Sequence, residues 1–153
     1  MNSSTSLELI PASNRDIRFI KYLLGENGLP YDDITYNLQH MFLAKTGSEI
    51  VGITGMEIYG RYGLLRSLVS VKKYRGAGYG KTITGKILKH AADSGVGTVY
   101  LLTTMAAGFF EKLGFKYIDR SSVPEPIATT GEFTQLCPES ADCMMLDLTK
   151  QII

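Results

Sequence analysis

Short runs of apolar and β-branched residues, bounded by turn residues, follow one another along the chain and predict strands. The strongest run covers residues 64–71, and the glycine-containing turns at residues 46–49 and 60–63 join the runs before it into antiparallel hairpins. We expect about six to seven strands in a mixed, mostly antiparallel sheet. The segments concerned are residues 7–10, 41–44, 50–59, 64–71, 99–102, 115–118 and 143–148.

Segments whose apolar residues recur at helical spacing lie between these strands. Residues 81–93 show one apolar helix face, and residues 17–24 follow a capping-box-like pair, Ser13 and Asp16. Residues 106–113 predict a shorter helix that ends at Gly114, and we also expect a helix beginning near residue 32 and one over residues 127–136. The order indicates one α/β (α+β) domain over residues 1–153, with a strand–loop–helix–strand unit at its centre.

Composition narrows the class of protein. The 153 residues carry a net charge of +1 and are 44% hydrophobic, which predicts a packed core and gives no reason to expect nucleic acid or an anionic membrane as partner. No apolar run reaches the roughly 18 residues of a membrane helix, and residues 1–6 do not resemble a signal peptide, so we expect a cytoplasmic protein. Cys137 and Cys143 are expected to be reduced thiols, and we expect no metal site.

A glycine loop stands between the strongest strand and the central helix. Gly76, Gly78 and Gly80 alternate there, and Arg75 and Lys81 add positive charge. Glycines let backbone amides approach a ligand, and a helix N-terminus attracts anions, so the loop predicts a phosphate site. A Walker loop would need glycine where Arg75 stands, and a Rossmann loop would follow the first strand of a βαβ repeat. A tight turn without ligand is the other alternative.

These residues carry a family resemblance. The segment 75–80, Arg-Gly-Ala-Gly-Tyr-Gly, resembles the R/Q-x-x-G-x-G/A loop of the GNAT N-acetyltransferases, and residues 109–115, Phe-Phe-Glu-Lys-Leu-Gly-Phe, resemble their second motif. The resemblance covers nearly the whole chain. It implies a GNAT fold whose sheet splays between strands four and five, with helices on its faces. It also implies acetyl-CoA as cofactor and CoA as product.

In that family the pantetheine pairs with strand four and the pyrophosphate binds the glycine loop. The implied cofactor-binding residues are Leu68, Val69, Ser70, Val71, Arg75, Gly76, Ala77, Gly78, Tyr79, Gly80 and Lys81, with Phe110 packing under the cofactor.

Three segments narrow the resemblance. Residues 64–69, 100–104 and 132–141 look like GNAT enzymes associated with arsenic resistance and, less closely, like the acetyltransferase domain of N-acetylglutamate synthases. This implies acetylation of an α-amino group on an amino-acid-like molecule, such as the glutamate mimics arsinothricin and phosphinothricin.

A candidate acceptor site comes from the predicted hairpin. If residues 60–63 form its loop, Glu57 faces Arg66 on one side of the sheet. Arg66 would clamp a substrate carboxylate or phosphinate, Glu57 would accept the ammonium proton, and Ser67 is expected to bind the acceptor beside them. The alternative is a cross-strand ion pair that holds register, worth about 0.2–1 kcal/mol if exposed.

The sequence departs from the family pattern at three positions. Arg66 stands where many relatives carry a glutamate base, and Phe110 stands where many carry the tyrosine that protonates the leaving thiolate. Thr103 and Thr104, at the end of the fifth strand, are candidate substitutes in catalysis, or are ordinary strand-end hydroxyls. The synthase-like group has an arginine after this pair, and here Met105 puts glutamate itself in doubt as acceptor.

Other functions stay open. A GNAT enzyme with another small amine acceptor, such as a polyamine, would need an acidic lining, of which only Glu57 is evident. A non-catalytic acyl-CoA-binding sensor and a protein N-terminal acetyltransferase are further alternatives. Symmetric dimers are the commonest oligomers, so we expect a homodimer, in which residues 121–141 would close the acceptor pocket of their own or of a partner chain.

Overall fold

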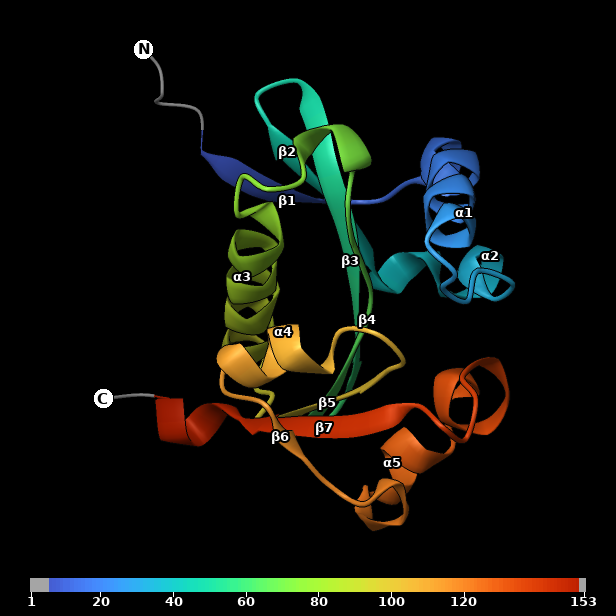
Figure 1. The fold of residues 1–153 in the computed structure, drawn as a ribbon, viewed down its shortest axis with the longest axis vertical. Coiled ribbons are helices and arrows are strands. Elements are labelled where there is room, and N and C mark those ends of the chain that lie inside the picture. Colours follow the sequence, from blue (N-terminus) through green and yellow to red (C-terminus); the bar gives the residue numbers. More distant parts are fainter. Residues whose placement is uncertain (1–5, 152–153) are drawn as a thin grey trace. The chain divides into compact units, whose positions relative to one another are not determined.

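A seven-stranded sheet runs through the chain, as the residue pattern predicted. The computed structural model describes residues 6–151, and the strand order in its sheet is β1-β2-β3-β4-β5-β7-β6 (Figure 1). The strands are β1 (Leu7–Pro11), β2 (Met41–Thr46), β3 (Glu49–Tyr59), β4 (Tyr62–Ser70), β5 (Thr98–Thr103), β6 (Lys116–Tyr117) and β7 (Asp142–Asp147). The expected mixed, mostly antiparallel α/β fold is confirmed.

The pairing between β4 and β5 is parallel and short. It joins Tyr62, Gly63 and Leu64 to Thr98, Val99 and Tyr100, although β4 continues to Ser70 and β5 to Thr103. The pairs of β1 with β2, β2 with β3, β5 with β7 and β6 with β7 are antiparallel. The pairing of β4 with β5 ends after three residue pairs, which agrees with the predicted splay between the fourth and fifth strands.

Two compact units make up the described chain. The first contains residues 6–56 and 67–87, and the second contains residues 57–66 and 88–151, so β3 and β4 each contribute to both. Within the described residues no helix is long and apolar enough to cross a membrane.

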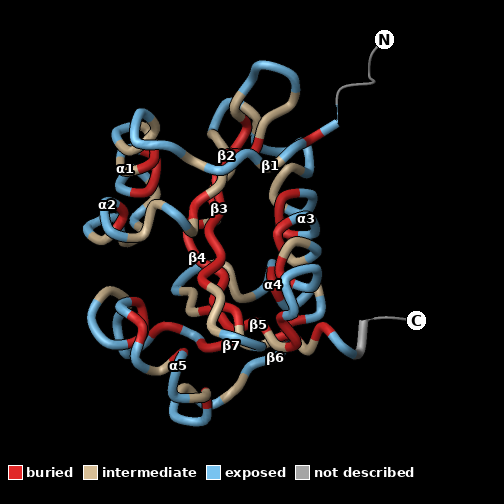
Figure 2. The backbone as a smooth tube through the Cα atoms, turned by 180° about the vertical axis from the view of Figure 1, so that it is seen from behind, coloured by how far each residue is buried: buried red, intermediate tan, exposed pale blue. Residues whose placement is uncertain are grey.

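The first unit packs helices on both faces of its strands. Helices α1 (Ile17–Glu26) and α2 (Ile34–Asn37) lie on one face, and α3 (Tyr79–Asp93) begins on the other (Figure 1). Ile20, Leu24 and Ile53 are fully buried in the core under α1, while Val51 and Ile83 are fully buried in the core under α3. Figure 2 shows that β3 is buried along most of its length, as expected of a strand with helices on both of its faces.

The second unit places its helices around β5, β6 and β7. Helix α4 (Ala107–Lys112) ends before Gly114, which has φ of 103° as expected of a helix C-cap. The core of the second unit includes Leu64, Tyr100, Ile127 and Phe133. The predicted helix over residues 127–136 is divided in the structure: α5 covers Glu125–Ala128 with Thr129 as its C-cap, and a π-helix covers Glu132–Leu136.

The hairpin between β3 and β4 is tighter than the pattern predicted. Its turn consists of Gly60 and Arg61 rather than residues 60–63, so β4 begins at Tyr62. Gly60 has φ of 64°, which a two-residue hairpin turn requires and which costs a glycine little.

Candidate active site

The glycine loop has the backbone that an anion site needs. Gly76 and Gly78 have φ of 91° and 81°, in the region that favours glycine. A Cβ atom built on either residue would meet no heavy atom within 4 Å, so the space beside them is open. Neither glycine is therefore required by crowding inside the protein. Both are required by the backbone turn, and both leave room for a ligand to approach the main chain.

Helix α3 starts directly behind this loop. The first bond that closes the helix runs from the amide of Thr82 to the carbonyl of Gly78, at 3.2 Å. The amides of residues 78–81 precede it and therefore have no acceptor inside the helix. Together with the positive end of the helix dipole they form a site suited to phosphate oxygens. The residues present thus fit the pyrophosphate of an acyl-CoA, the group that the sequence predicted here.

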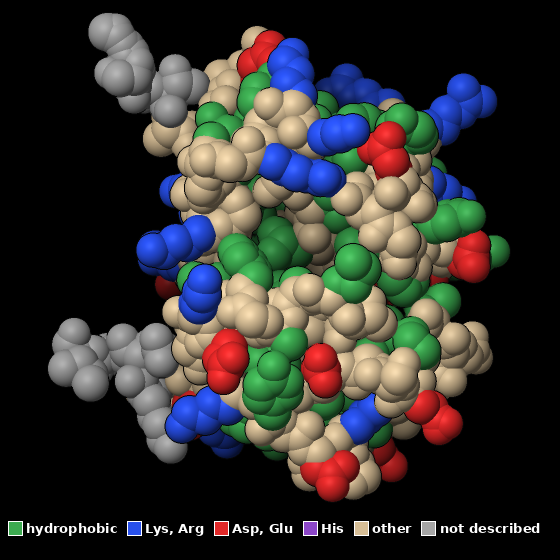
Figure 3. All heavy atoms as spheres, in the orientation of Figure 1, with side chains coloured by type: hydrophobic (Ala, Val, Ile, Leu, Met, Phe, Trp, Pro, Cys, Tyr) green, Lys and Arg blue, Asp and Glu red, His purple; other side chains and the backbone are tan. Residues whose placement is uncertain are grey.

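Exposed positive charges surround the loop. In the space-filling view, basic side chains gather at the end of the first unit where β4 leads into α3 (Figure 3). Arg75 donates from Nε to the carbonyl of Ser70 at 3.2 Å and from Nη2 to the side-chain oxygen of Asn27 at 2.7 Å. Both acceptors are neutral, so Arg75 is held in place with its charge unreduced. The other basic residues of this segment that are exposed are Lys72, Lys73 and Lys81.

The predicted pantetheine strand contains a backbone irregularity. Ser67 has φ of 60°, and in the described chain it is the single residue other than glycine with a positive φ. Such a residue costs of the order of 1–3 kcal/mol and is most often found at functional positions. Leu68 packs toward the α3 core and Val69 toward the α1 core, while the amide of Val71 donates to the carbonyl of Val51 at 2.8 Å.

Glu57 and Arg66 contact each other, as the predicted hairpin implied. Arg66 donates from Nη1 to Glu57 Oε2 at 2.9 Å, and the side chains are only 1% and 4% exposed. Burial makes this pair different from the exposed ion pair considered as its alternative, because desolvated charges are costly unless they are compensated. The structure thus confirms the contact between the two side chains, and their roles stay a prediction.

A second carboxylate reaches Arg66 from the C-terminal part of the chain. Glu132 Oε2 lies 3.5 Å from Arg66 Nε, with its side chain 4% exposed. Sequence reasoning missed Glu132, although the segment that contains it was quoted for the family resemblance. Glu132 stands between Gly131 and Phe133, and a charged residue gives no signal of burial in the sequence. In the structure it lies in the π-helix Glu132–Leu136, where both Glu132 and Phe133 are buried. These three residues are called the Arg66 cluster below.

Two further groups contact the Arg66 cluster. The hydroxyl of Tyr59 donates to Glu57 Oε1. Burial is the largest cause that raises the pKa of Tyr59, and this hydrogen bond is the second. The thiol of Cys137 lies 3.7 Å from Glu132 Oε1, and burial together with that carboxylate raises the pKa of Cys137 to about 12. Both groups therefore stay protonated near neutral pH and can donate to the carboxylates. Cys137 and Cys143 are free thiols.

The other predicted site residues lie in the second unit. Thr103 Oγ1 accepts the amide of Ala106 at 3.0 Å, so it caps the turn before α4, and Thr104 is exposed. Phe110 is 6% exposed and packs edge-on against Phe115, with ring centroids 5.5 Å apart. Phe110 is thus a core residue of this unit, and a role under the cofactor stays a prediction.

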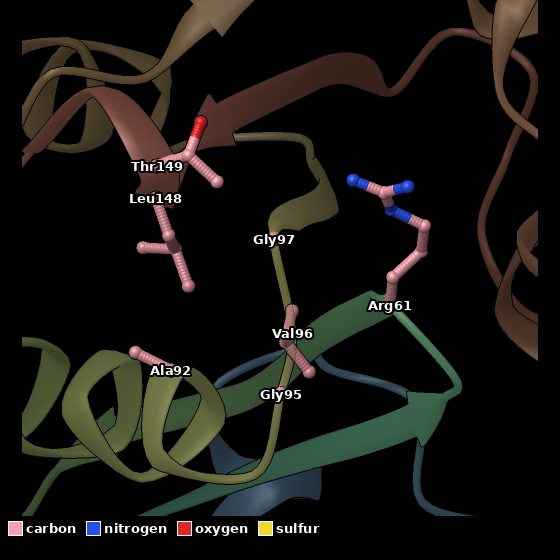
Figure 4. Close-up of a pocket in the computed structure, with 7 residues that line it drawn as sticks. All are labelled: Arg61, Ala92, Gly95, Val96, Gly97, Leu148 and Thr149. Atoms are coloured by element: carbon pink, nitrogen blue, oxygen red, sulfur yellow. The ribbon is translucent and has the colours of Figure 1, made fainter.

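One cavity of the second unit contains none of the predicted residues. It has a volume of about 350 Å³ and lies at the C-terminal end of α3, with the guanidinium of Arg61 and the hydroxyl of Thr149 on its walls (Figure 4). Its lining is completed by Ala92, Gly95, Val96, Gly97 and Leu148. In the part of the chain that the structure describes, no group of three His, Cys, Asp or Glu residues is placed to hold a metal ion.

Comparisons with known proteins identify the family to which this chain belongs. Residues 37–117, more than half of the chain, match the family described as "Acetyltransferase (GNAT) domain". An uncharacterized N-acetyltransferase of Chlorobaculum tepidum is 25% identical over 122 residues, which cover 79% of this chain and 76% of that protein.

Solved structures share this fold at low sequence identity, and two of them serve as examples. N-acetylglutamate synthase from Neisseria gonorrhoeae, complexed with coenzyme A and L-arginine, gives a TM-score of 0.80 at 15% identity; the match covers 94% of this chain and only 34% of that one. Rv2747 from Mycobacterium tuberculosis, in complex with CoA and NLQ, gives 0.75 at 20% identity, with 92% and 98% covered. With its glycine loop, open helix N-terminus and matching domain, the chain belongs to the GNAT family and is an N-acetyltransferase that uses acetyl-CoA.

Proposed function

We propose that this enzyme acetylates the amino group of an amino-acid-like small molecule, for which the glutamate mimics arsinothricin and phosphinothricin are examples. The single observation that carries the proposal is the buried pair of Glu57 and Arg66, a carboxylate and a guanidinium held together at 2.9 Å. The likeness of residues 64–69, 100–104 and 132–141 to arsenic-resistance-associated enzymes supports it. Further support comes from the fold shared with N. gonorrhoeae N-acetylglutamate synthase, solved with coenzyme A and N-acetyl-glutamate.

The two side chains suit the two charged groups of such an acceptor. The guanidinium of Arg66 has five N–H donors in a planar fork, which match the oxygens of a carboxylate or phosphinate. Glu57 accepts a proton from the acceptor's ammonium, directly or through water, so that the amine can attack. Tyr59 donates to the other oxygen of Glu57 and thereby fixes the orientation of that carboxylate.

Acetyl-CoA supplies a thioester, whose thiolate must be protonated as it leaves. Thr103 already accepts the amide of Ala106 through its oxygen, which leaves its own hydroxyl hydrogen to donate. Thr104 is exposed at the same strand end. We propose one of these hydroxyls as the donor in place of the family's tyrosine.

A panel assay tests the proposed function. Wild-type enzyme is given acetyl-CoA with amino acids, phosphinic and arsinic analogues, or polyamines, and thiol release is recorded. We expect turnover with acceptors that carry an amino group beside an anionic group. Tight CoA binding with no turnover for any amine would overturn the proposal and favour the acyl-CoA sensor.

The homodimer and the cytoplasmic location stay predictions.

The Arg66 cluster favours a second candidate, a small amine without an acidic group. Glu57 and Glu132 give Arg66 two carboxylates, and an acidic lining is what a polyamine site requires. Ornithine and putrescine differ only by the α-carboxylate, so their kcat/KM ratio separates the candidates. The second candidate is selected if the wild type has the higher kcat/KM with putrescine and if Glu132→Gln shifts the ratio toward ornithine. A higher kcat/KM with ornithine in the wild type selects the first candidate.

A further inference from the structure

The end of helix α1 is fixed by local sequence. The amide of Leu29 donates to the carbonyl of Leu24 at 2.9 Å and the amide of Gly28 to that of Gly25 at 3.2 Å, with φ of 70° at Gly28. These bonds form a Schellman motif, in which the residue before the left-handed glycine is the C-cap of the helix. That residue is Asn27, so the position of its side chain is set by the helix end.

The side-chain amide of Asn27 has one orientation that satisfies both of its neighbours. Its Nδ2 donates to the carbonyl of Leu23 at 2.8 Å, and its Oδ1 accepts from Arg75 Nη2 at 2.7 Å. The carbonyl of Leu23 can only accept and the guanidinium can only donate, so the amide cannot be reversed. Asn27 thus connects the last turn of α1 to the arginine of the glycine loop, 48 residues away.

Arg75 is held from two sides by neutral groups. Its Nε bonds to the carbonyl of Ser70, the last residue of β4, and its Nη2 bonds to Asn27. Two of its five N–H donors are used in this way, and no carboxylate among the described residues pairs with it. A neutral acceptor orients a guanidinium and leaves its charge available, whereas a carboxylate would cancel the charge.

We propose that Asn27 is a positioning residue for acetyl-CoA binding: it orients Arg75 beside the glycine loop, so that the guanidinium is directed toward the pyrophosphate. The proposal concerns the donor side and is independent of the acceptor's identity. An arginine side chain with several rotatable bonds loses much rotamer freedom when it is fixed on a phosphate. Asn27 fixes that side chain before the cofactor binds, and preorganisation of this kind increases affinity.

Two substitutions at residue 27 separate orientation from charge. Asn27→Ala removes the acceptor for Arg75 and also the donor to Leu23. Asn27→Asp keeps an acceptor for Arg75 and forms an ion pair with it, but places a negative charge next to the phosphate site. If Asn27 only holds the loop, aspartate should replace it well. If it presents a charged arginine to the pyrophosphate, aspartate should be worse than alanine.

The experiment measures cofactor binding without turnover. Dissociation constants for CoA are measured by calorimetry, and those for pantetheine, which lacks the pyrophosphate, by ligand-observed NMR. We expect Asn27→Ala to weaken CoA binding about fivefold to tenfold and Asn27→Asp to weaken it further, with pantetheine unchanged. Urea unfolding of each variant confirms that it is folded. Asn37→Ala is the matched control, since Asn37 Nδ2 also donates to a helix carbonyl, that of Asp33 at 3.1 Å, without contacting the loop.

Three outcomes would overturn the proposal. One is unchanged CoA affinity in both variants at residue 27. Another is equal weakening of CoA and pantetheine, which indicates a general loss of structure. The third is wild-type affinity in Asn27→Asp, which indicates that the contact serves only to hold the loop. None of these depends on which amine is acetylated, so a failed acceptor panel leaves the test intact.

Discussion

Two arginines, nine residues apart in sequence, are held in opposite ways. Arg66, in the second unit, is 1% exposed at its side chain and lies against the carboxylates of Glu57 and Glu132. Arg75, in the first unit, is exposed and bonds to an amide oxygen and a main-chain carbonyl. The first arginine has its charge compensated inside the protein, and the second keeps an uncompensated charge at the surface. The partners of an arginine therefore indicate its role better than its presence in a motif does.

The same comparison bears on the acceptor. A substrate anion that binds Arg66 must share the guanidinium with Glu57 and Glu132, whereas an anion at the glycine loop meets unpaired helix amides and a charge held by neutral groups. At the proposed donor site, the groups that would bind a phosphate are therefore in place before the ligand binds. At the proposed acceptor site, a substrate anion would have to displace a carboxylate from Arg66.

Removal of Arg66 should have the largest effect. Arg66→Ala leaves the carboxylates of Glu57 and Glu132 buried without the guanidinium that both contact, and breaking a buried ion pair costs about 3–5 kcal/mol of unfolding free energy. Urea unfolding measures the loss. The control is Lys89→Ala, which removes an exposed pair with Asp93 and should cost about 0.3–0.5 kcal/mol. Similar losses in both variants would show that the cluster is not a desolvated network.

Removal of Arg75 should affect binding rather than folding. We expect Arg75→Ala to weaken CoA binding about tenfold or more, since a charge-assisted contact to phosphate is lost, and to change stability little. Calorimetry with CoA gives the first quantity and urea unfolding the second. Arg15→Ala, which removes an exposed charge elsewhere in the first unit, is the control. A large loss of stability with unchanged CoA affinity would reverse the roles assigned to the two arginines.

The glycine loop can be tested through backbone strain alone. Gly78→Ala forces a Cβ into a φ of 81° and should cost about 1–2 kcal/mol, although no atom obstructs the methyl group. Gly85→Ala, on an open part of α3 with an ordinary φ, should instead stabilise the protein by about 0.5–1 kcal/mol. Thermal unfolding of both variants checks the opposite signs. A stabilised Gly78→Ala would mean that the loop adopts another backbone in solution.

The two threonines should give the smallest effects. Thr103→Ala removes the acceptor for the amide of Ala106 and should cost about 0.5–1.5 kcal/mol, while Thr104→Ala should leave stability nearly unchanged. Unfolding measurements are combined with kcat for the best acceptor. A fall in kcat for either variant, beyond what its stability explains, identifies that hydroxyl as the proton donor. Unchanged kcat in both would make them ordinary strand-end residues.

Much of the fold could be predicted because its signals are local. Ser13 and Asp16 form the expected capping box, with the amide of Ser13 donating to Asp16 Oδ2 at 2.8 Å. All seven strands lie where the apolar runs placed them, within a few residues at their ends. The division of residues 127–136 was missed because a single amphipathic pattern does not show that a helix is interrupted at Thr129. The hairpin turn was placed two residues too long because Gly60 alone supplies the backbone that it needs.

By itself, the sequence determined the conformation of the glycine loop, which we predict to be the donor site. Gly76, Gly78 and the helix that follows act through backbone conformation and neighbouring residues, which short segments encode directly. The tertiary structure alone brought Glu132 to Arg66, 66 residues apart in the chain, and Asn27 to Arg75. Contacts of that kind depend on how distant segments pack and on which charges lose their water, and neither property is written in the local pattern.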